Sequence, residues 1–273
     1  MTAGGGMFEK ILIVGCGNMA GAMLQGWLAA GLDAGRFTVV DPAPRELPLG
    51  VRSLSAAPAD ETFDAILLGI KPQLLATVAP SVSPLAGPGT VLLSILAGVE
   101  LSVLRGHFPE AAGIVRAMPN LSAALGKSPI ALASCGLDDA RRQEAFGLFG
   151  PLGTPEWIAE DQFDLVTALA GSGPAFVYRF IDALSQAATA LGLPVEQSRR
   201  LALATVEGAS ALAAASPHDP SELARRVASP GGVTQAGLDT LDRDEALARL
   251  VTDTLRAARD RSAEMAAEAR GKG

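Results

Sequence analysis

The sequence predicts an α/β protein with a doubly wound parallel sheet over residues 8–159 and an all-helical domain over residues 160–273. Three observations lead to this prediction. A glycine-rich loop follows an apolar run near the N-terminus, short apolar runs then alternate with helical patterns as far as Trp157, and stretches rich in alanine and leucine follow Glu160. Short apolar runs that alternate with helical segments are typical of parallel sheets covered by helices on both faces.

The predicted strands of the first domain are mostly continuous apolar runs, as expected for parallel strands buried on both faces. They are Ile11–Val14, Phe37–Val40, Ala65–Ile70, Val91–Ile95 and Ile114–Ala117. Between the first two, Met19–Ala30 places apolar residues at helical spacing and ends at Gly31, a residue that readily closes a helix. The start of the chain contains three consecutive glycines, so residues 1–7 are expected to form a flexible tail.

The second domain has almost no strand-like runs and is predicted to be helical throughout. The predicted helices are Asp161–Ala170, Pro174–Leu191, Val195–Ala215, Pro220–Val227 and Asp244–Ala269. Pro174–Leu191 and Val195–Ala215 are apolar over too much of their circumference for a small domain on its own. We therefore expect a second copy of the chain to cover part of this surface.

The composition argues against several classes of function. The formal net charge is −7 and aromatic residues make up 4% of the chain, so we expect no nucleic-acid partner. Cys16 and Cys135 are the only cysteines and there are two histidines, so we expect no disulfide framework and no metal. Because no targeting pattern and no long apolar segment is seen, we expect a cytoplasmic protein without membrane association.

Gly15, Gly17 and Ala20 form the pattern Gly-x-Gly-x-x-Ala between a predicted strand and a predicted helix. In that context the pattern predicts a dinucleotide-binding, Rossmann-type domain. Gly15 permits the tight turn, Gly17 lets a diphosphate approach the backbone, and Ala20 allows close packing of helix on strand. The same predicted cofactor loop contains Cys16, Asn18 and Met19. The alternative is a glycine-rich turn that serves only packing.

Asp41 ends the second predicted strand, where a carboxylate accepts hydrogen bonds from the adenine ribose and repels a 2′-phosphate. This residue favours NADH slightly over NADPH. Arg45 lies four residues on and can pair with a 2′-phosphate, and an Asp-Pro pair is also a common turn opener. NADPH and NADH both stay open as the cofactor.

Further cofactor-binding residues are predicted after the later strands, because the carboxyl ends of parallel strands face the ligand in this fold. Those at the end of the third strand and just after it are Gly69, Ile70, Lys71 and Pro72, and those after the fourth are Ala97 and Gly98. A solvated strand-end lysine is the alternative for Lys71. Asn120 follows the fifth strand and is expected either to bond the cofactor's carboxamide or to cap a turn.

The turn Ser229-Pro230-Gly231-Gly232-Val233-Thr234 predicts a small-anion site at the start of a helix. Its glycines leave backbone N–H groups uncovered, and the helix dipole favours an anion there. Thr234 adds a hydroxyl group, although a threonine at this position can also cap its own helical turn. His107 and His218 lie beside prolines, away from both glycine-rich motifs, and are expected at the surface.

These motifs occur in the order found in pyrroline-5-carboxylate reductases, which the chain resembles over its whole length after residue 7. The motifs are Gly15-Cys16-Gly17-Asn18-Met19, Lys71-Pro72-Gln73, Ser94-Ile95-x-Ala97-Gly98-Val99, Arg116-x-Met118-Pro119-Asn120, Gly171-Ser172-Gly173-Pro174-Ala175, Gly192-Leu193-Pro194 and Ser229-Pro230-Gly231-Gly232-x-Thr234. The chain departs from the family at Leu121-Ser122, usually Thr-Pro, and at Phe176 and Val233, usually Tyr and Thr.

The resemblance implies reduction of Δ1-pyrroline-5-carboxylate to L-proline by hydride transfer from NADPH or NADH, the last step of proline synthesis. It also implies that the helical domain binds the substrate and interlocks with a partner's in a homodimer, often within a larger ring. The resemblance further implies that the family's second threonine, Thr234 here, is the catalytic residue at the ring nitrogen. Substrate binding is implied for Ser229, Gly231, Gly232, Val233, Thr234 and Glu160.

The chemistry requires no strong acid, because hydride transfer to a protonated cyclic imine neutralises a cation and depends mainly on positioning. Two alternatives stay open. A 3-hydroxyacid dehydrogenase of the same two-domain plan needs a lysine where Val177 stands. A non-catalytic dinucleotide-binding regulator would not need an intact Ser229–Thr234 turn.

Overall fold

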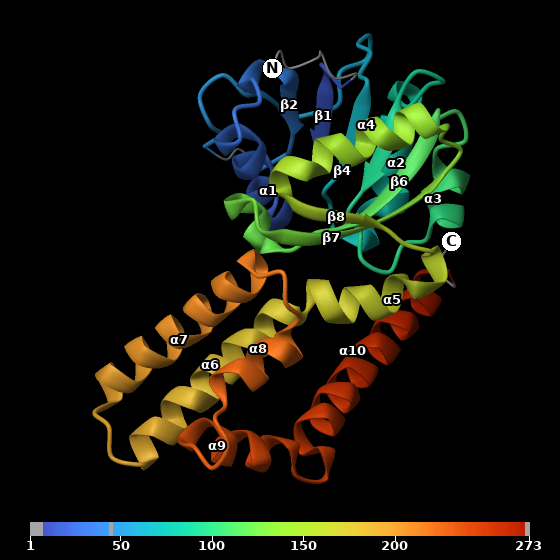
Figure 1. Cartoon of the computed structure of the whole chain (residues 1–273). Coiled ribbons are helices and arrows are strands. Elements are labelled where there is room, and N and C mark those ends of the chain that lie inside the picture. The colour runs from blue at the N-terminus through green and yellow to red at the C-terminus, as the bar shows by residue number, and fades with distance from the viewer. Residues whose placement is uncertain (1–7, 44–45, 271–273) are drawn as a thin grey trace. The chain divides into compact units, whose positions relative to one another are not determined.

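The computed structural model describes residues 8–43 and 46–270 of the chain (Figure 1). The tail predicted at residues 1–7 and the residue Arg45 lie outside the described residues. The chain forms two compact units, one of residues 1–172 together with 258–273 and one of residues 173–257. The domain boundary near residue 160 stays a prediction.

Within the described residues, the first unit is built on an eight-stranded sheet in the order β3-β2-β1-β4-β5-β6-β7-β8. The strands are β1 (Ile11–Val14), β2 (Phe37–Val40), β3 (Arg52–Leu54), β4 (Ala65–Leu68), β5 (Val91–Ser94), β6 (Gly113–Met118), β7 (Ser128–Cys135) and β8 (Gly153–Trp157). Neighbouring strands run parallel except β6 and β7, which are antiparallel. The strand order reverses between β1 and β4, and in such sheets ligands bind beyond the carboxyl ends at this point.

Helices cover both faces of this sheet, as predicted (Figure 1). The described α-helices of the unit are α1 (Asn18–Ala29), α2 (Leu75–Val82), α3 (Leu101–His107), α4 (Asp139–Phe149) and α5 (Phe163–Val166). Along β1 the side chains alternate between two apolar cores: Ile11 and Ile13 enter the core that contains Trp27, and Leu12 and Val14 enter the opposite one. This alternation explains why buried parallel strands are apolar at every position.

The end of α1 confirms the role predicted for Gly31. This residue has a φ of +91°, and its N–H donates to the carbonyl of Leu28 at 3.0 Å. The N–H of Leu32 donates to the carbonyl of Trp27, also at 3.0 Å. This pair of bonds is the Schellman arrangement, in which a left-handed residue satisfies the last carbonyls of a helix.

The predicted helical stretch Asp161–Ala170 is helical, but it is not one regular α-helix. The segment consists of a 3₁₀ turn, η6 (Glu160–Gln162), then α5, then a π-helical turn, η7 (Thr167–Gly171). Helix α6 begins only at Gly173. The change of geometry occurs just before Pro174, whose ring and missing N–H disfavour a continuous α-helix.

The second unit is helical, as predicted. Its described helices are α6 (Gly173–Ala190), α7 (Val195–Ala215), α8 (Pro220–Val227), α9 (Val233–Asp242) and the first part of α10 (Ala246–Arg270). Its buried residues are small, namely Ser185, Ser198 and Ala202, whereas large apolar side chains such as Leu212 are exposed. A single copy of this unit therefore encloses little core of its own. In the part of the chain that the structure describes, no helix has the length and apolar character needed to cross a membrane.

The packing of α1 leads to a testable prediction at Gly26. A Cβ atom there would overlap the carbonyl oxygen of Ala123 and lie 2.7 Å from Leu152 Cδ2, so Gly26→Ala should lower the free energy of unfolding by about 1–3 kcal/mol. Gly21→Ala is the control on the same helix, because nothing lies within 4 Å of its added Cβ. That variant should gain roughly 0.5–1 kcal/mol from helix propensity. Urea unfolding measures both, and equal stability of the two variants would contradict the packing argument.

Candidate active site

The glycine loop after β1 packs directly against the turn after β4. Gly15 has a φ of +82°, and its N–H donates to the carbonyl of Val40 at 2.8 Å. A Cβ on Gly15 would lie 2.7 Å from Ile70 Cγ2, and a Cβ on Gly69 would overlap the Gly15 carbonyl oxygen and lie 2.8 Å from Ala20 Cβ. The structure therefore brings together three of the predicted cofactor residues, and neither glycine tolerates a side chain without a shift.

The N-terminus of α1 is open to a ligand. Gly17 is the residue before the helix, no side chain caps the first turn, and no acidic residue lies in it. Nothing lies within 4 Å of a Cβ built on Gly17. The first N–H groups of a helix without a cap carry partial positive charge and bind phosphate groups. These residues fit the diphosphate of a dinucleotide.

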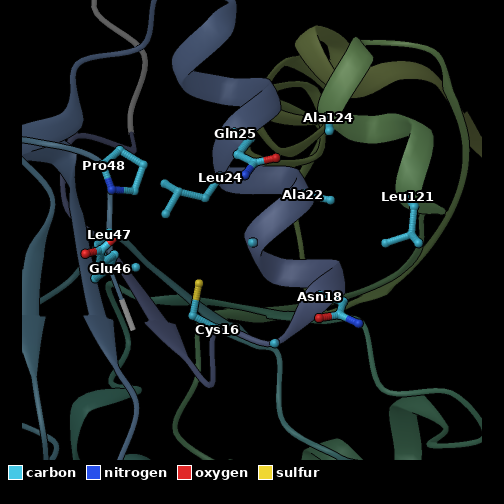
Figure 2. Close-up of a pocket in the computed structure, with 12 residues that line it drawn as sticks. Cys16, Asn18, Ala22, Leu24, Gln25, Glu46, Leu47, Pro48, Leu121 and Ala124 are labelled. Atoms are coloured by element: carbon cyan, nitrogen blue, oxygen red, sulfur yellow. The ribbon is translucent and has the colours of Figure 1, made fainter. Parts of the chain in front are cut away.

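A cavity of about 420 Å³ lies beside this loop (Figure 2). The lining residues come from the glycine loop, from α1 and from two further segments: Cys16, Gly17, Asn18, Gly21, Ala22, Leu24, Gln25, Glu46, Leu47, Pro48, Leu121 and Ala124. Figure 2 shows α1 between the segment that carries Glu46 and the helical turn that carries Leu121. These two residues were missed in the sequence because no motif marks the loops that approach a helix from the side. Met19, also predicted for the cofactor, is half-buried in the first turn of α1.

Asp41 contacts the glycine loop through its carboxylate. Oδ2 accepts a hydrogen bond from the Cys16 N–H at 2.9 Å, and Oδ1 accepts one from the Ala43 N–H at 3.0 Å. The second bond is the turn-opening arrangement that the sequence left open for Asp41. Each carboxylate oxygen can accept a further hydrogen bond. The negative charge therefore lies at the glycine loop, and its contact with a ribose stays a prediction.

The remaining cofactor residues of the sequence analysis lie at the carboxyl ends of β4 and β5. Lys71 is exposed and precedes the short turn η2 (Pro72–Leu74). Pro72 and Ala97 line a second cavity, of about 310 Å³, together with His107 and residues of α10. Gly98 has a φ of +72° and is buried, and a Cβ there would lie 3.4 Å from the backbone nitrogen of Ala266. Gly98 thus packs against the last turns of α10, and its cofactor role stays a prediction.

The two histidines are half-buried rather than fully exposed. His107 ends α3, and His218 lies in the turn before α8, where its N–H donates to Ser216 Oγ at 3.0 Å. Neither is part of the glycine-rich motifs.

Glu160 connects the first residues of α3 with a buried cation. Its Oε1 accepts the N–H of Leu101 at 2.7 Å and lies 3.4 Å from a terminal nitrogen of Arg116. Arg116 is 2% exposed, and its guanidinium lies 4.0 Å from the ring centroid of Phe163. Burial lowers the pKa of Arg116, and the nearby carboxylates, Glu160 foremost, oppose this shift. The substrate role of Glu160 stays a prediction, and the arginine partner was not predicted.

Asn120 is a turn cap, one of the two roles that the sequence left open. Its Oδ1 accepts the backbone N–H of Ser122 at 2.9 Å at the start of the 3₁₀ turn η4 (Leu121–Leu125). Its Nδ2 donates to the carbonyl of Ala170 at 2.9 Å. Both ends of the side chain are therefore bound to protein groups.

The second unit contains the predicted anion site. Gly231 has a φ of +70°, and the N–H of Gly232 donates to the carbonyl of Ser229 at 2.9 Å, which closes a tight turn before α9. A Cβ on Gly232 would lie 2.6 Å from Ser229 Oγ and 3.0 Å from the Ser229 carbonyl oxygen, so a side chain there would require Ser229 to shift. No side chain caps α9 and its first turn has no acidic residue. Val233, the first residue of α9, is 93% exposed.

Thr234 offers an unoccupied hydroxyl at this helix start. The side chain is exposed, and within the described residues its hydroxyl makes no hydrogen bond. Thr240, on the same helix, instead donates to the carbonyl of Ala236 at 3.2 Å. Thr234 therefore does not cap its own helical turn in this structure, which was the alternative role.

Two family models match the chain. Residues 160–265 match pyrroline-5-carboxylate reductase dimerisation, and residues 10–98 match NADP oxidoreductase, coenzyme F420-dependent. The pyrroline-5-carboxylate reductase of Pseudomonas aeruginosa is 34% identical over 266 residues, which cover 94% of this chain and 97% of that protein. The one of Aquifex aeolicus is 35% identical over 239 residues, with 85% and 89% covered.

Solved structures support the same family. A pyrroline-5-carboxylate reductase from Coxiella burnetii has a TM-score of 0.87 at 28% identity and covers 94% of this chain and 98% of its own. The pyrroline carboxylate reductase from Plasmodium falciparum, solved with NADP bound, has a TM-score of 0.80 at 25% identity, with 96% and 100% covered. The resemblance drawn from the motifs is confirmed, and the chain belongs to the pyrroline-5-carboxylate reductase family.

Proposed function

We propose that this chain reduces Δ1-pyrroline-5-carboxylate to L-proline with NADH or NADPH, the final step of proline synthesis. One observation carries the proposal. Helices α1 and α9 each follow a glycine turn and start without a side-chain cap or an acidic residue in the first turn. One suits the diphosphate of a dinucleotide and the other suits a small carboxylate. The names of the relatives support the reaction.

The reaction places few demands on the protein's acids and bases. Bound NAD(P)H supplies the hydride. The imine carbon accepts it, the C=N bond becomes a single bond, and the proton already on the nitrogen remains there. Because the positive charge disappears during this step, the side chains need only hold the ring in place and favour its protonated form.

The substrate is assigned to the turn before α9. The turn formed by Gly231, Gly232 and Val233 binds its carboxylate at the uncapped start of α9, with Ser229 beside it, while the Gly232 N–H closes the turn on the Ser229 carbonyl. The hydroxyl of Thr234 holds the ring nitrogen and is the catalytic group. Glu160 is also assigned to substrate binding, as the resemblance implies, and its Oε1 accepts the Leu101 N–H and pairs with Arg116.

The cofactor is assigned to the loop Gly15–Met19, to Asp41, and to residues at the ends of β4 and β5. The latter are Gly69, Ile70, Lys71, Pro72, Ala97 and Gly98. Asp41 favours NADH, because its charge repels a 2′-phosphate.

The matched dimerisation domain indicates a homo-oligomer. We propose a homodimer as the basic assembly, alone or within a ring of dimers, without nucleic acid and in the cytoplasm. The exposed apolar side chains of α6 and α7 support an interface there. They include Tyr178, Phe180, Leu203 and Leu212.

Thr234→Ala should reduce kcat/KM by roughly 5-fold to 150-fold, equivalent to about 1–3 kcal/mol for one hydrogen bond to a charged group. NADH affinity, measured by fluorescence titration, should not change. Thr240→Ala on the same helix is the control, because its hydroxyl already donates to Ala236. Thr234→Ser should recover most of the rate. An unaltered rate in Thr234→Ala would remove the catalytic assignment.

Asp41→Ser should shift the ratio of kcat/KM values toward NADPH by about one or two powers of ten, because solvent screens part of the lost charge. Direct binding of both cofactors should shift in the same direction, while the maximal rates stay similar. Asp33→Ser is the control, since Asp33 also accepts a backbone N–H, from Gly35 at 2.7 Å. An unchanged ratio, with wild type already preferring NADPH, would show that Asp41 does not face the ribose.

Light scattering at micromolar concentration should give at least twice the chain mass of 27.8 kDa. Leu212→Asp, at a side chain that is 64% exposed on α7, should weaken the assembly. Leu49→Asp, fully exposed in the first unit, should leave it intact. A wild-type mass equal to one chain would exclude the dimer.

A further inference from the structure

A proline leaves one buried carbonyl of the chain without its usual partner. In an α-helix the carbonyl of Ala170 would accept the N–H of residue 174, but that residue is Pro174, which has no N–H. The chain forms a π-helical turn here, in which the N–H of Ser172 donates to the carbonyl of Thr167 at 3.0 Å. Ala170 is 7% exposed, so water does not readily replace the missing donor.

Asn120 supplies the donor from a different part of the chain. Its Nδ2 lies 2.9 Å from the Ala170 carbonyl oxygen, and the side chain is 5% exposed. The contact joins the loop after β6 to the π turn, 50 residues further along the chain. No sequence motif marks the contact between Asn120 and Ala170, because the Ala170 carbonyl needs this donor only where Pro174 removes the helical one.

The direction of the Asn120 amide is fixed by its other contacts. Oδ1 accepts the backbone N–H of Ser122 at 2.9 Å and also its hydroxyl. The N–H of Asn120 itself donates to Ser128 Oγ at 2.9 Å. A flipped amide would turn its NH₂ group toward the Ser122 N–H and its oxygen toward the Ala170 carbonyl, so the orientation with Nδ2 on Ala170 is the one that pairs every group.

We propose that Asn120 is a positioning residue for the reductase reaction. It donates a hydrogen bond to the Ala170 carbonyl, which Pro174 leaves without its helical donor. Asn120 thereby holds the π turn Thr167–Gly171, through which the chain leaves the first unit at Ser172. Hydride transfer depends steeply on the placement of the reacting groups, so a looser turn lowers turnover without loss of cofactor binding. This inference rests on the proposed function.

The test is a double-mutant cycle of Asn120→Ser and Pro174→Ala. Serine remains a good cap for η4 but is too short to reach Ala170, whereas alanine at position 174 restores an N–H to the helix. Asn120→Ser alone should lower kcat by about 10-fold to 100-fold and lower the unfolding midpoint, with NADH affinity unchanged. In the Pro174→Ala background the same substitution should have a much smaller effect on both quantities.

Two further variants test the two ends of the Asn120 amide separately. Asn120→Asp also caps η4 but places a carboxylate against the Ala170 carbonyl, so it should be at least as damaging as Asn120→Ser. Ser122→Ala removes one donor to Oδ1 while leaving Nδ2 on Ala170, so its kcat should stay close to that of wild type.

Additive effects of Asn120→Ser and Pro174→Ala would overturn the proposal, because Asn120 would then not act through the carbonyl. A loss of NADH affinity in Asn120→Ser would overturn it as well and would make Asn120 a cofactor contact. The double-mutant cycle can also be measured by unfolding, which needs no substrate. If the wild type were inactive while the two substitutions had non-additive effects on the unfolding midpoint, the proposed function would be contradicted and the Asn120–Pro174 link would stand.

Discussion

The close approach of the β1 loop to the turn after β4 is the constraint on which the first unit depends. Gly15 and Gly69 lie against each other with no room for a Cβ on either. This contact lets α1 start directly above the carboxyl ends of the strands, with an uncapped first turn. It also places the Cys16 N–H where Asp41 can bind it. The candidate site is therefore made mainly of backbone groups. The close approach of the two loops limits which side chains fit there.

The central strands could be predicted because burial on both faces makes them apolar at every position. β1 and β2 have the predicted bounds, whereas β3, β7 and β8 were not predicted. β3 and β8 lie at edges of the sheet, where one neighbour suffices and polar residues or Pro155 are tolerated. β7 lies between β6 and the edge strand β8, and it pairs antiparallel to β6, outside the parallel alternation that the sequence pattern indicates.

The candidate site also contains features that the sequence predicts and features that it does not. Glycine loops could be found in the sequence, because their chemistry resides in local backbone geometry. The partners of Asn120 and Glu160 could not, because Ala170 and Arg116 are distant in sequence and are paired by burial. Arg116 is a charge within an apolar strand, a signal that a partner must exist but not which one. Residue types thus predict the candidate ligand-binding loops, and tertiary contacts determine how the candidate groups are held.

The last part of α10 belongs to the first unit although it follows the second in the chain. Ala266 is buried, its backbone packs against Gly98, and Ser262 donates to Asp164 at 2.7 Å. Because a nascent chain emerges from its N-terminus, the nucleotide-binding unit acquires this segment only after the whole helical unit has been synthesised. Ribosomal synthesis therefore imposes an order: the sheet can form early, but the surface around Gly98 stays exposed until the last part of α10 has been synthesised.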